Sequence, residues 1–199
     1  MKRRDALKNI GLAAGFAAIT PSIFSMLQSC TSTTETWVPN YLTSEEKTVV
    51  TNLVDIIIPK TATTPAASEV NVPQFIDNYI LEVLEVKDQE ITRTAFKKLI
   101  SILKPDADAN LDKVTAEEYK SLLDKHMFLS KEKDPEREAN PEALTMTTSE
   151  LLNQLKWMTI YGYKNSEEVG ENILAYDPVP AVYYCGDLQE LTNGRSYSL

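Results

Sequence analysis

The sequence holds a single histidine, His126, and two cysteines, Cys30 and Cys185. An imidazole of ordinary pKa is the side chain best suited to general acid–base catalysis near neutral pH, and a cysteine nucleophile needs such a base beside it. Nothing in the spacing brings Cys185 to His126, which shares an apolar helical stripe with Leu122 and Leu123. We therefore interpret His126 as a hydrogen-bonded structural histidine and predict no catalytic residue.

A second candidate for chemistry is a spacing similar to that of a calcium loop. Asp106, Asp108 and Asn110 occupy alternate positions, and Glu117 falls at the twelfth position. The sixth position of such a loop needs glycine for a sharp turn, and Leu111 stands there. The sequence therefore favours a turn followed by a capped helix, and we predict no metal site.

Three acidic doublets could be interpreted as paired carboxylates for acid–base chemistry. They lie at residues 45–46, 117–118 and 167–168. Each falls in the first turn of a predicted helix, where negative charge is favourable at the positive end of the helix dipole. We interpret all three as helix starts.

The composition limits the partners and cofactors. The 199 residues include 20 basic and 29 acidic side chains, a net charge of −9. Four basic residues and one acidic residue lie in the first ten, so the remainder has 16 basic against 28 acidic residues, a charge of about −12. Such a body repels nucleic-acid phosphates. Glycine motifs for dinucleotides or phosphates and a haem-attachment motif are absent from the sequence. We expect no nucleic-acid partner and no cofactor in this chain.

Residues 1–29 have the pattern of an export signal. Arg3 and Arg4 precede an apolar, Ala/Gly-rich run over residues 10–19, which is shorter than the roughly 20 residues of a bilayer span. An arginine pair before a weakly apolar run resembles the twin-arginine signal, and we expect the twin-arginine machinery to export the chain. An ordinary secretory signal is the alternative.

Cys30 closes this segment and is the predicted lipidation site. Residues 27–30 resemble the cleavage box of bacterial lipoproteins, in which the cysteine becomes lipid-modified. The polar residues that follow, to about residue 42, predict a tether between a lipid anchor and a folded body. A structural cysteine is the alternative. We expect an exported bacterial protein anchored at the periplasmic side of a membrane or at the cell surface.

Residues 43–199 predict a mainly α fold: one small domain of about five helices with an irregular C-terminal segment. Capping boxes, in which a threonine and a glutamate three residues later satisfy free N–H groups, begin at Thr43, Thr115 and Thr147. Residues 130–146 are charged and contain two prolines, which predicts a solvated loop. Apolar periodicity predicts helices over residues 44–58, 73–84, 88–103, 116–127 and 148–161. The inward faces are expected to include Phe75, Tyr79, Val83, Ile102 and Tyr161.

The segment 176–186 holds the candidates for a partner interface. Tyrosine suits interfaces because a large apolar ring ends in a hydroxyl that tolerates water. The alternative is that the segment packs across the helices and closes the core. If Cys30 is lipidated, the second cysteine is an unpaired thiol, for which burial, pairing with a partner and reactivity all remain open. The candidate interface residues are Tyr176, Tyr183, Tyr184 and Cys185.

Several stretches, in their order and spacing, resemble one family. Residues 53–59, 64–68 and 72–77 match a helix ending in an apolar–proline step, a T-P-G-A-S loop and a valine that leads to Phe-Ile-Asp. Residues 161–166 and 176–186 match a G-Y-x-x-S turn and a tyrosine- and proline-rich stretch. Over about residues 43–187 the chain resembles the gluconate 2-dehydrogenase subunit 3 family. Ala66 and Ala181 stand where the family has glycine.

The resemblance implies a companion subunit. Members of this family are small partners of exported FAD-dependent dehydrogenases of the glucose–methanol–choline type, which oxidise sugars, sugar acids or polyols. The large subunit carries FAD and the chemistry, and the small subunit bears the export signal. The expectation is a non-catalytic subunit that assists export, assembly and membrane attachment of the flavin subunit. A free-standing surface lipoprotein that binds a small ligand or another protein is the alternative, and an enzyme in its own right is a third.

Overall fold

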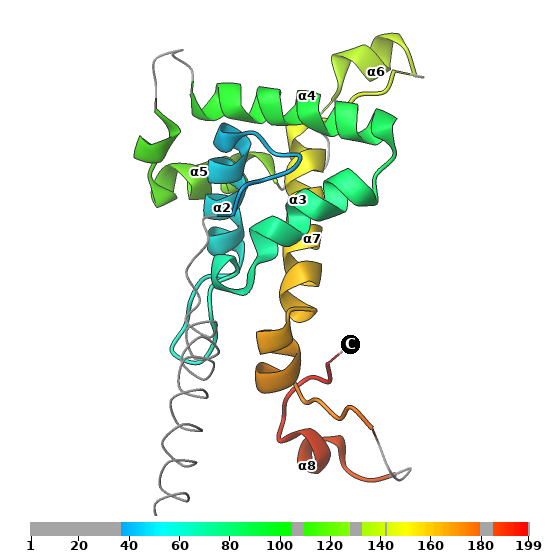
Figure 1. Ribbon diagram of the computed structural model, residues 1–199. Helices are drawn as coiled ribbons and strands as arrows, with labels where there is room; N and C mark the ends of the chain where they lie inside the picture. The colour runs from blue at the N-terminus through cyan, green and yellow to red at the C-terminus, as the bar shows by residue number, and fades with distance from the viewer. Residues whose placement is uncertain (1–36, 105–109, 128–132, 142, 180–184, 199) are drawn as a thin grey trace, which may run out of the picture. The chain divides into compact units, whose positions relative to one another are not determined.

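The computed structural model describes residues 37–104, 110–127, 133–141, 143–179 and 185–198. The chain divides into two compact units, Met1–Val38 and Pro39–Leu199, and the helices of the described ranges belong to the second unit. The described residues are mainly helical, which confirms the predicted mainly α class (Figure 1). In these ranges no strand forms, and a single isolated bridge joins Ala175 and Tyr197.

The five predicted helices all form, with ends that differ by a few residues from those expected. Their bounds are α2 Ser44–Ile57, α3 Val72–Glu82, α4 Val86–Leu103, α5 Ala116–His126 and α7 Thr148–Lys164. Shorter elements are α6 Pro135–Ala139, α8 Leu188–Thr192, two 3-10 turns at Ser68–Val70 and Leu111–Lys113, and a π-helical turn at Glu168–Ile173.

Local sequence explains where α2, α5 and α7 begin. At α2, the Thr43 N–H donates to Glu46 Oε2 at 2.8 Å, and the Glu46 N–H donates back to Thr43 Oγ1 at 3.3 Å. This reciprocal pair satisfies N–H groups that the first turn of a helix leaves free. All three predicted capping boxes are confirmed; the other two pair Thr115 with Glu118 and Thr147 with Glu150.

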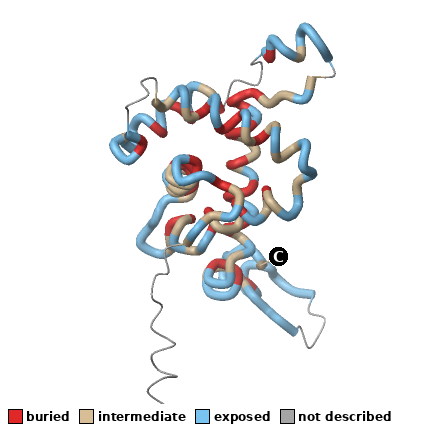
Figure 2. Tube along the Cα trace, turned by 45° about the horizontal axis from the view of Figure 1, so that its top comes forward, coloured by how far each residue is buried: buried red, intermediate tan, exposed pale blue. Residues whose placement is uncertain are grey.

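The core lies between the long helices. α7 contacts α2, α3, α4 and α5, and α2 also contacts the other three. The buried residues gather where these helices meet, while the segment after α7 is largely exposed (Figure 2). The largest fully buried side chains include Leu53, Ile76, Phe96, Leu99, Tyr119, Leu151 and Met158.

Three residues expected in the core are exposed instead. Val83 follows the last residue of α3 and no longer lies on its inward face. Ile102 lies beyond Leu99, the last buried residue of α4. Tyr161 is displaced from the core because the inward face of α7 continues through Thr159 and Gly162, both buried. Helical periodicity predicts a face, and it does not predict how far neighbouring helices cover that face.

Two predicted irregular regions contain more structure than expected. Within residues 133–141, α6 forms in the stretch predicted as a loop. The Asp134 carboxylate caps it by accepting from the Glu136 N–H at 3.0 Å and also accepts from Thr145 Oγ1 at 2.6 Å. The predicted irregular stretch after residue 161 holds the end of α7, the π-helical turn and α8. Proline at the first position of α6 was a usable signal, because that position needs no N–H.

Candidate functional site

Most of the residues predicted to act in export or docking lie outside the described ranges. These are Arg3 and Arg4 of the export signal, Cys30 of the lipidation site, and Tyr183 and Tyr184 of the candidate interface. They stay predictions.

The two described members of the candidate interface are both exposed. Tyr176 is 49% exposed, and the Cys185 thiol is exposed and forms no disulfide within the described ranges. Burial of Cys185 is thereby excluded, and pairing with a partner or reactivity stays open. The backbone beside Tyr176 is fixed, since the Ala175 N–H donates to the Ser196 carbonyl at 2.8 Å and the Ser198 N–H donates to the Ala175 carbonyl at 2.9 Å.

His126 ends α5 and is partly buried beside Glu118 and Lys125, at a shallow cleft. Its Nδ1 atom is buried and makes no hydrogen bond to any described residue. The interpretation of a fully hydrogen-bonded histidine is therefore wrong for this nitrogen. No three His, Cys, Asp or Glu side chains among the described residues are grouped as metal ligands.

The calcium-like spacing is only partly described, because Asp106 and Asp108 lie outside the described ranges. Asn110 caps the following 3-10 turn by accepting from the Asp112 N–H at 2.9 Å. The capping box of Thr115 and Glu118 then begins α5. These described residues form the expected turn and capped helix.

A buried aspartate holds the start of the body. Asp77 on α3 is fully buried, and its carboxylate accepts hydrogen bonds from three consecutive backbone N–H groups, those of Asn40 at 2.7 Å, Tyr41 at 3.0 Å and Leu42 at 2.7 Å. A buried carboxylate needs such donors to offset its lost hydration. The sequence showed Asp77 only as part of a family-like stretch. Its position on the apolar face of a predicted helix was the signal for this role.

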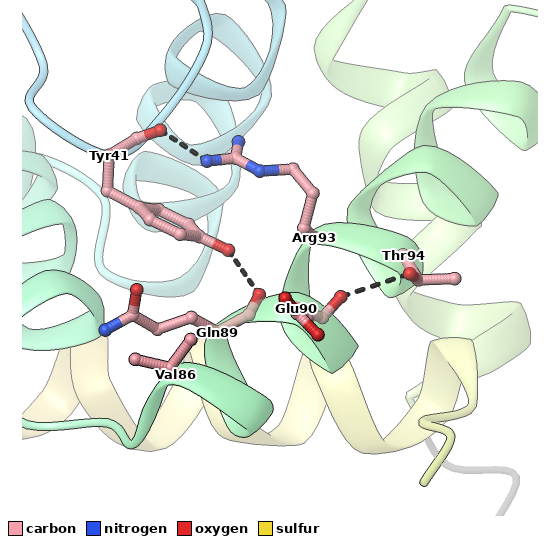
Figure 3. A pocket seen from close by; sticks show the side chains of 6 residues that line it. All are labelled: Tyr41, Val86, Gln89, Glu90, Arg93 and Thr94. Atoms are coloured by element: carbon pink, nitrogen blue, oxygen red, sulfur yellow. Dashed lines mark hydrogen bonds between the residues drawn. The ribbon is translucent and has the colours of Figure 1, made fainter.

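Arg93 on α4 reinforces the same junction. Its guanidinium pairs with the buried Glu46 carboxylate. It also donates to the Tyr41 carbonyl at 2.6 Å and lies 3.9 Å from the centre of the Tyr41 ring (Figure 3). The Tyr41 hydroxyl donates to the Gln89 carbonyl at 2.6 Å. Burial raises the pKa of Tyr41. The positive charge of Arg93 lowers this pKa, and the negative charge of Glu46 raises it. Glu46 and Arg93 thus satisfy one another as a structural lock.

A cleft of about 430 Å³ opens beside this lock (Figure 3). The Arg93 guanidinium that borders it is already engaged, and the Thr94 hydroxyl donates to the Glu90 carbonyl at 3.1 Å. Two of the polar side chains that line the cleft are therefore already engaged within the protein. Its lining residues are Tyr41, Val86, Gln89, Glu90, Arg93 and Thr94.

Four aromatic side chains of α3 and α7 form a surface that we call the aromatic patch: Phe75, Tyr79, Trp157 and Tyr161. The Phe75 ring centre lies 5.7 Å from that of Tyr79 and 5.9 Å from that of Tyr161. Trp157 lies 6.4 Å from Tyr79 and stacks on Tyr161 at 5.1 Å with an interplanar angle of 9°. Trp157 is 53% exposed and Tyr161 42%. Sequence reasoning missed this surface because it placed three of the four rings in the core.

The region that contains these helices also matches a known protein family. The family model described as gluconate 2-dehydrogenase subunit 3 matches residues 44–180, well over half of the chain. The chain belongs to the gluconate 2-dehydrogenase subunit 3 family. The match confirms the resemblance and makes the chain a subunit of a dehydrogenase complex, which implies association with a catalytic dehydrogenase subunit. Neither the curated proteins nor the solved structures gave a significant match.

The stretches that resemble the subunit 3 family meet in space. The Tyr163 hydroxyl donates to the Pro65 carbonyl at 2.9 Å, across 98 residues of sequence, and Ser166 Oγ donates to the Tyr163 carbonyl at 2.8 Å. Ser68 is held to α2 by Asp55, whose carboxylate accepts from its N–H at 2.8 Å and its hydroxyl at 2.7 Å. These contacts give the family-like residues a structural role, because they hold the loop between α2 and α3 against both α7 and α2.

In the part of the chain that is described, no helix is both long and apolar enough to span a bilayer.

Proposed function

We propose that this chain is the non-catalytic small subunit of an exported, FAD-dependent dehydrogenase of the glucose–methanol–choline type that oxidises a sugar, sugar acid or polyol. FAD and the chemistry belong to the partner subunit. The observation that carries the proposal is the match to subunit 3 of gluconate 2-dehydrogenase across most of the folded body.

The chemistry of the described residues supports an accessory role. The two most buried carboxylates serve structure: Asp77 binds three backbone N–H groups, and Glu46 pairs with Arg93. The only histidine of the sequence, His126, ends a helix with one ring nitrogen unpaired. A general base needs a second group to orient it, and no hydrogen bond from the described residues supplies one at this nitrogen.

Export and attachment form the second part of the proposal. The twin-arginine route carries folded cargo, so a cofactor-loaded flavin subunit could be exported while bound to a partner that bears Arg3 and Arg4. A lipid on Cys30 would then hold the complex at a membrane. In such a complex the Asp77 and Arg93 contacts would hold the end of the predicted tether, residues 40–42, on the folded body.

Deletion of the gene in the native host tests the proposal. We expect a flavin dehydrogenase subunit to stay in the cytoplasm, and the full-length chain to restore its export. Purification of the wild-type chain from detergent-solubilised membranes should yield that subunit, with flavin absorbance and a stoichiometry set by mass spectrometry. A chain that purifies alone, with export of every flavin enzyme unchanged by the deletion, would support the free-standing lipoprotein instead.

A further inference from the structure

We propose that the aromatic patch on α3 and α7 is the docking site for the catalytic subunit of the dehydrogenase complex. The identity of this partner rests on the proposed function, whereas the surface is assigned from the structure. The partner surface that fits is apolar at its centre and acidic at its rim.

The exposure and size of the patch indicate the centre of an interface. Trp157 and Tyr161 are about half exposed, although each stacks on the other. Since a large aromatic side chain can bury about 150–250 Å², their exposed faces offer roughly 200 Å² to a partner. A standard interface needs about 800 Å² from each protein. The patch therefore has the size of a hot-spot cluster, and surrounding surface must complete the interface.

The patch is also preorganised. An ideal Cβ on Gly162 would lie only 2.6 Å from Cδ1 of Phe75, so the Phe75 ring occupies the space that a side chain at position 162 would fill. Phe75 in turn contacts both Tyr79 and Tyr161. Rings held in this way lose little conformational freedom when a partner binds, which favours affinity.

Charge identifies the kind of partner. From Leu151 to Lys164, α7 has no acidic residue and two basic ones, Lys156 and Lys164, although the body as a whole is strongly acidic. On α3, Asp77 is buried and satisfied, which leaves Glu82 at the end of the helix as its exposed acid. Lys164 follows Trp157 by seven residues and Tyr161 by three, so it lies on the same face of α7 as these rings. A basic residue at this edge favours a partner with acidic residues beside an apolar centre.

A second copy of this chain fits less well. Two patches face to face would bring like-charged lysines together, and each copy carries a net charge of −9. The patch is also part of the matched family region, residues 44–180, and what the name of that family implies is a dehydrogenase partner. Both points favour the catalytic subunit as the occupant.

The test uses the complex purified from the native host and the double variant W157A/Y161A. We expect its affinity for the catalytic subunit to fall by about 30-fold or more, the effect of removing a hot-spot residue. The matched controls are I102A and L144A, which truncate exposed apolar residues of α4 and of the segment before α7. They should bind as wild type. Circular dichroism and thermal melting of each variant must show that it is folded.

A charge variant gives a second readout that does not disturb the rings. K156E with K164E should weaken binding, and added salt should reduce the difference from wild type, because like charges would then meet at the rim. K97E with K98E on α4 is the charge-matched control. An affinity of W157A/Y161A equal to that of wild type would overturn the docking site, and an affinity of K156E/K164E equal to that of wild type would overturn the acidic rim assigned to the partner surface.

A label placed in the patch reports occupancy directly. The sequence has two tryptophans, so W37F leaves Trp157 as the single site for 5-fluorotryptophan. Its fluorine resonance should shift when the catalytic subunit binds and should lose its dependence on solvent isotope. A shift that depends on the concentration of this chain alone would show a second copy on the patch and overturn the proposal.

The outcomes distinguish a failure of the docking site from a failure of the proposed function. A wild-type preparation without a dehydrogenase subunit overturns the proposed function and this partner with it. Co-purification that survives W157A/Y161A overturns the docking site and leaves the proposed function standing. In that case the exposed C-terminal residues, Tyr176 and Cys185 among them, become the surface to vary.

Discussion

The ring of Phe75 on α3 lies directly against the backbone of Gly162 on α7, with Cδ1 only 2.6 Å from where a Cβ would be. Glycine inside a helix costs about 1 kcal/mol relative to alanine. Its presence within a 17-residue helix is explained by this contact.

Gly162→Ala should therefore destabilise the protein, although alanine is the better helix former. We expect a loss of about 1–3 kcal/mol, because the new methyl group must displace a packed ring. Chemical denaturation of the isolated chain measures it. Phe75→Leu removes the rigid ring, and in that background Gly162→Ala should be much better tolerated. Additive effects of the two changes would show that the contact does not limit the packing.

Asp77→Ala should loosen the junction between tether and body. Three backbone N–H groups would lose their acceptor, and we expect a loss of about 2–3 kcal/mol of unfolding free energy. Asp77→Asn keeps one acceptor oxygen and should cost less. Hydrogen exchange at residues 40–42 should accelerate in the alanine variant, and Asn78→Ala, an exposed neighbour on α3, is the control. Unchanged exchange would contradict the anchoring role.

Acid should weaken the start of α5. Hydrogen bonds from the N–H and then the hydroxyl of Thr115 lower the pKa of Glu118 below its ordinary value of 4.5. A carboxylate with a lowered pKa in the folded state adds stability above pH 4.5, and that stability is lost as the pH falls through the folded-state pKa. Glu118→Gln should flatten the pH dependence of unfolding below about pH 4.5. Equal slopes for wild type and Glu118→Gln would contradict this assignment.

Export should depend on the arginine pair. Arg3→Lys with Arg4→Lys should strand the precursor, and the flavin subunit with it, in the cytoplasm, because the twin-arginine receptor reads that pair. Fractionation followed by immunoblotting measures both chains. Normal processing of the double variant would indicate the general secretory route.

Anchoring should depend on Cys30. Cys30→Ala should release the mature chain from membranes, because it removes the site of the lipid. Mass spectrometry of the native N-terminus shows the modification directly, and Cys185→Ala is the control that keeps Cys30. An unmodified Cys30, or a mature chain that begins elsewhere, would refute the lipid anchor.

Local sequence was sufficient to predict the five long helices and the family. The capping boxes at Thr43, Thr115 and Thr147 act over three residues, so their effect can be read from neighbouring residues alone. The family pattern likewise lies in the order and spacing of short stretches. Where the pattern was ambiguous, as at α6, the signal was present in Asp134 and Pro135, but the charge of the surrounding stretch obscured it.

Only the tertiary structure decided what those helices present to a partner. Asp77, Glu46 and Arg93 form one junction because α2, α3 and α4 meet there, and no spacing in the sequence gives that meeting point. Tyr161 has the periodicity of a core residue, yet it is exposed, because the buried face of α7 runs through Thr159 and Gly162 and the Phe75 ring of α3 packs against Gly162. Burial depends on contacts between residues far apart in the chain, and that is the physical reason why the aromatic patch could not be found before the fold was known.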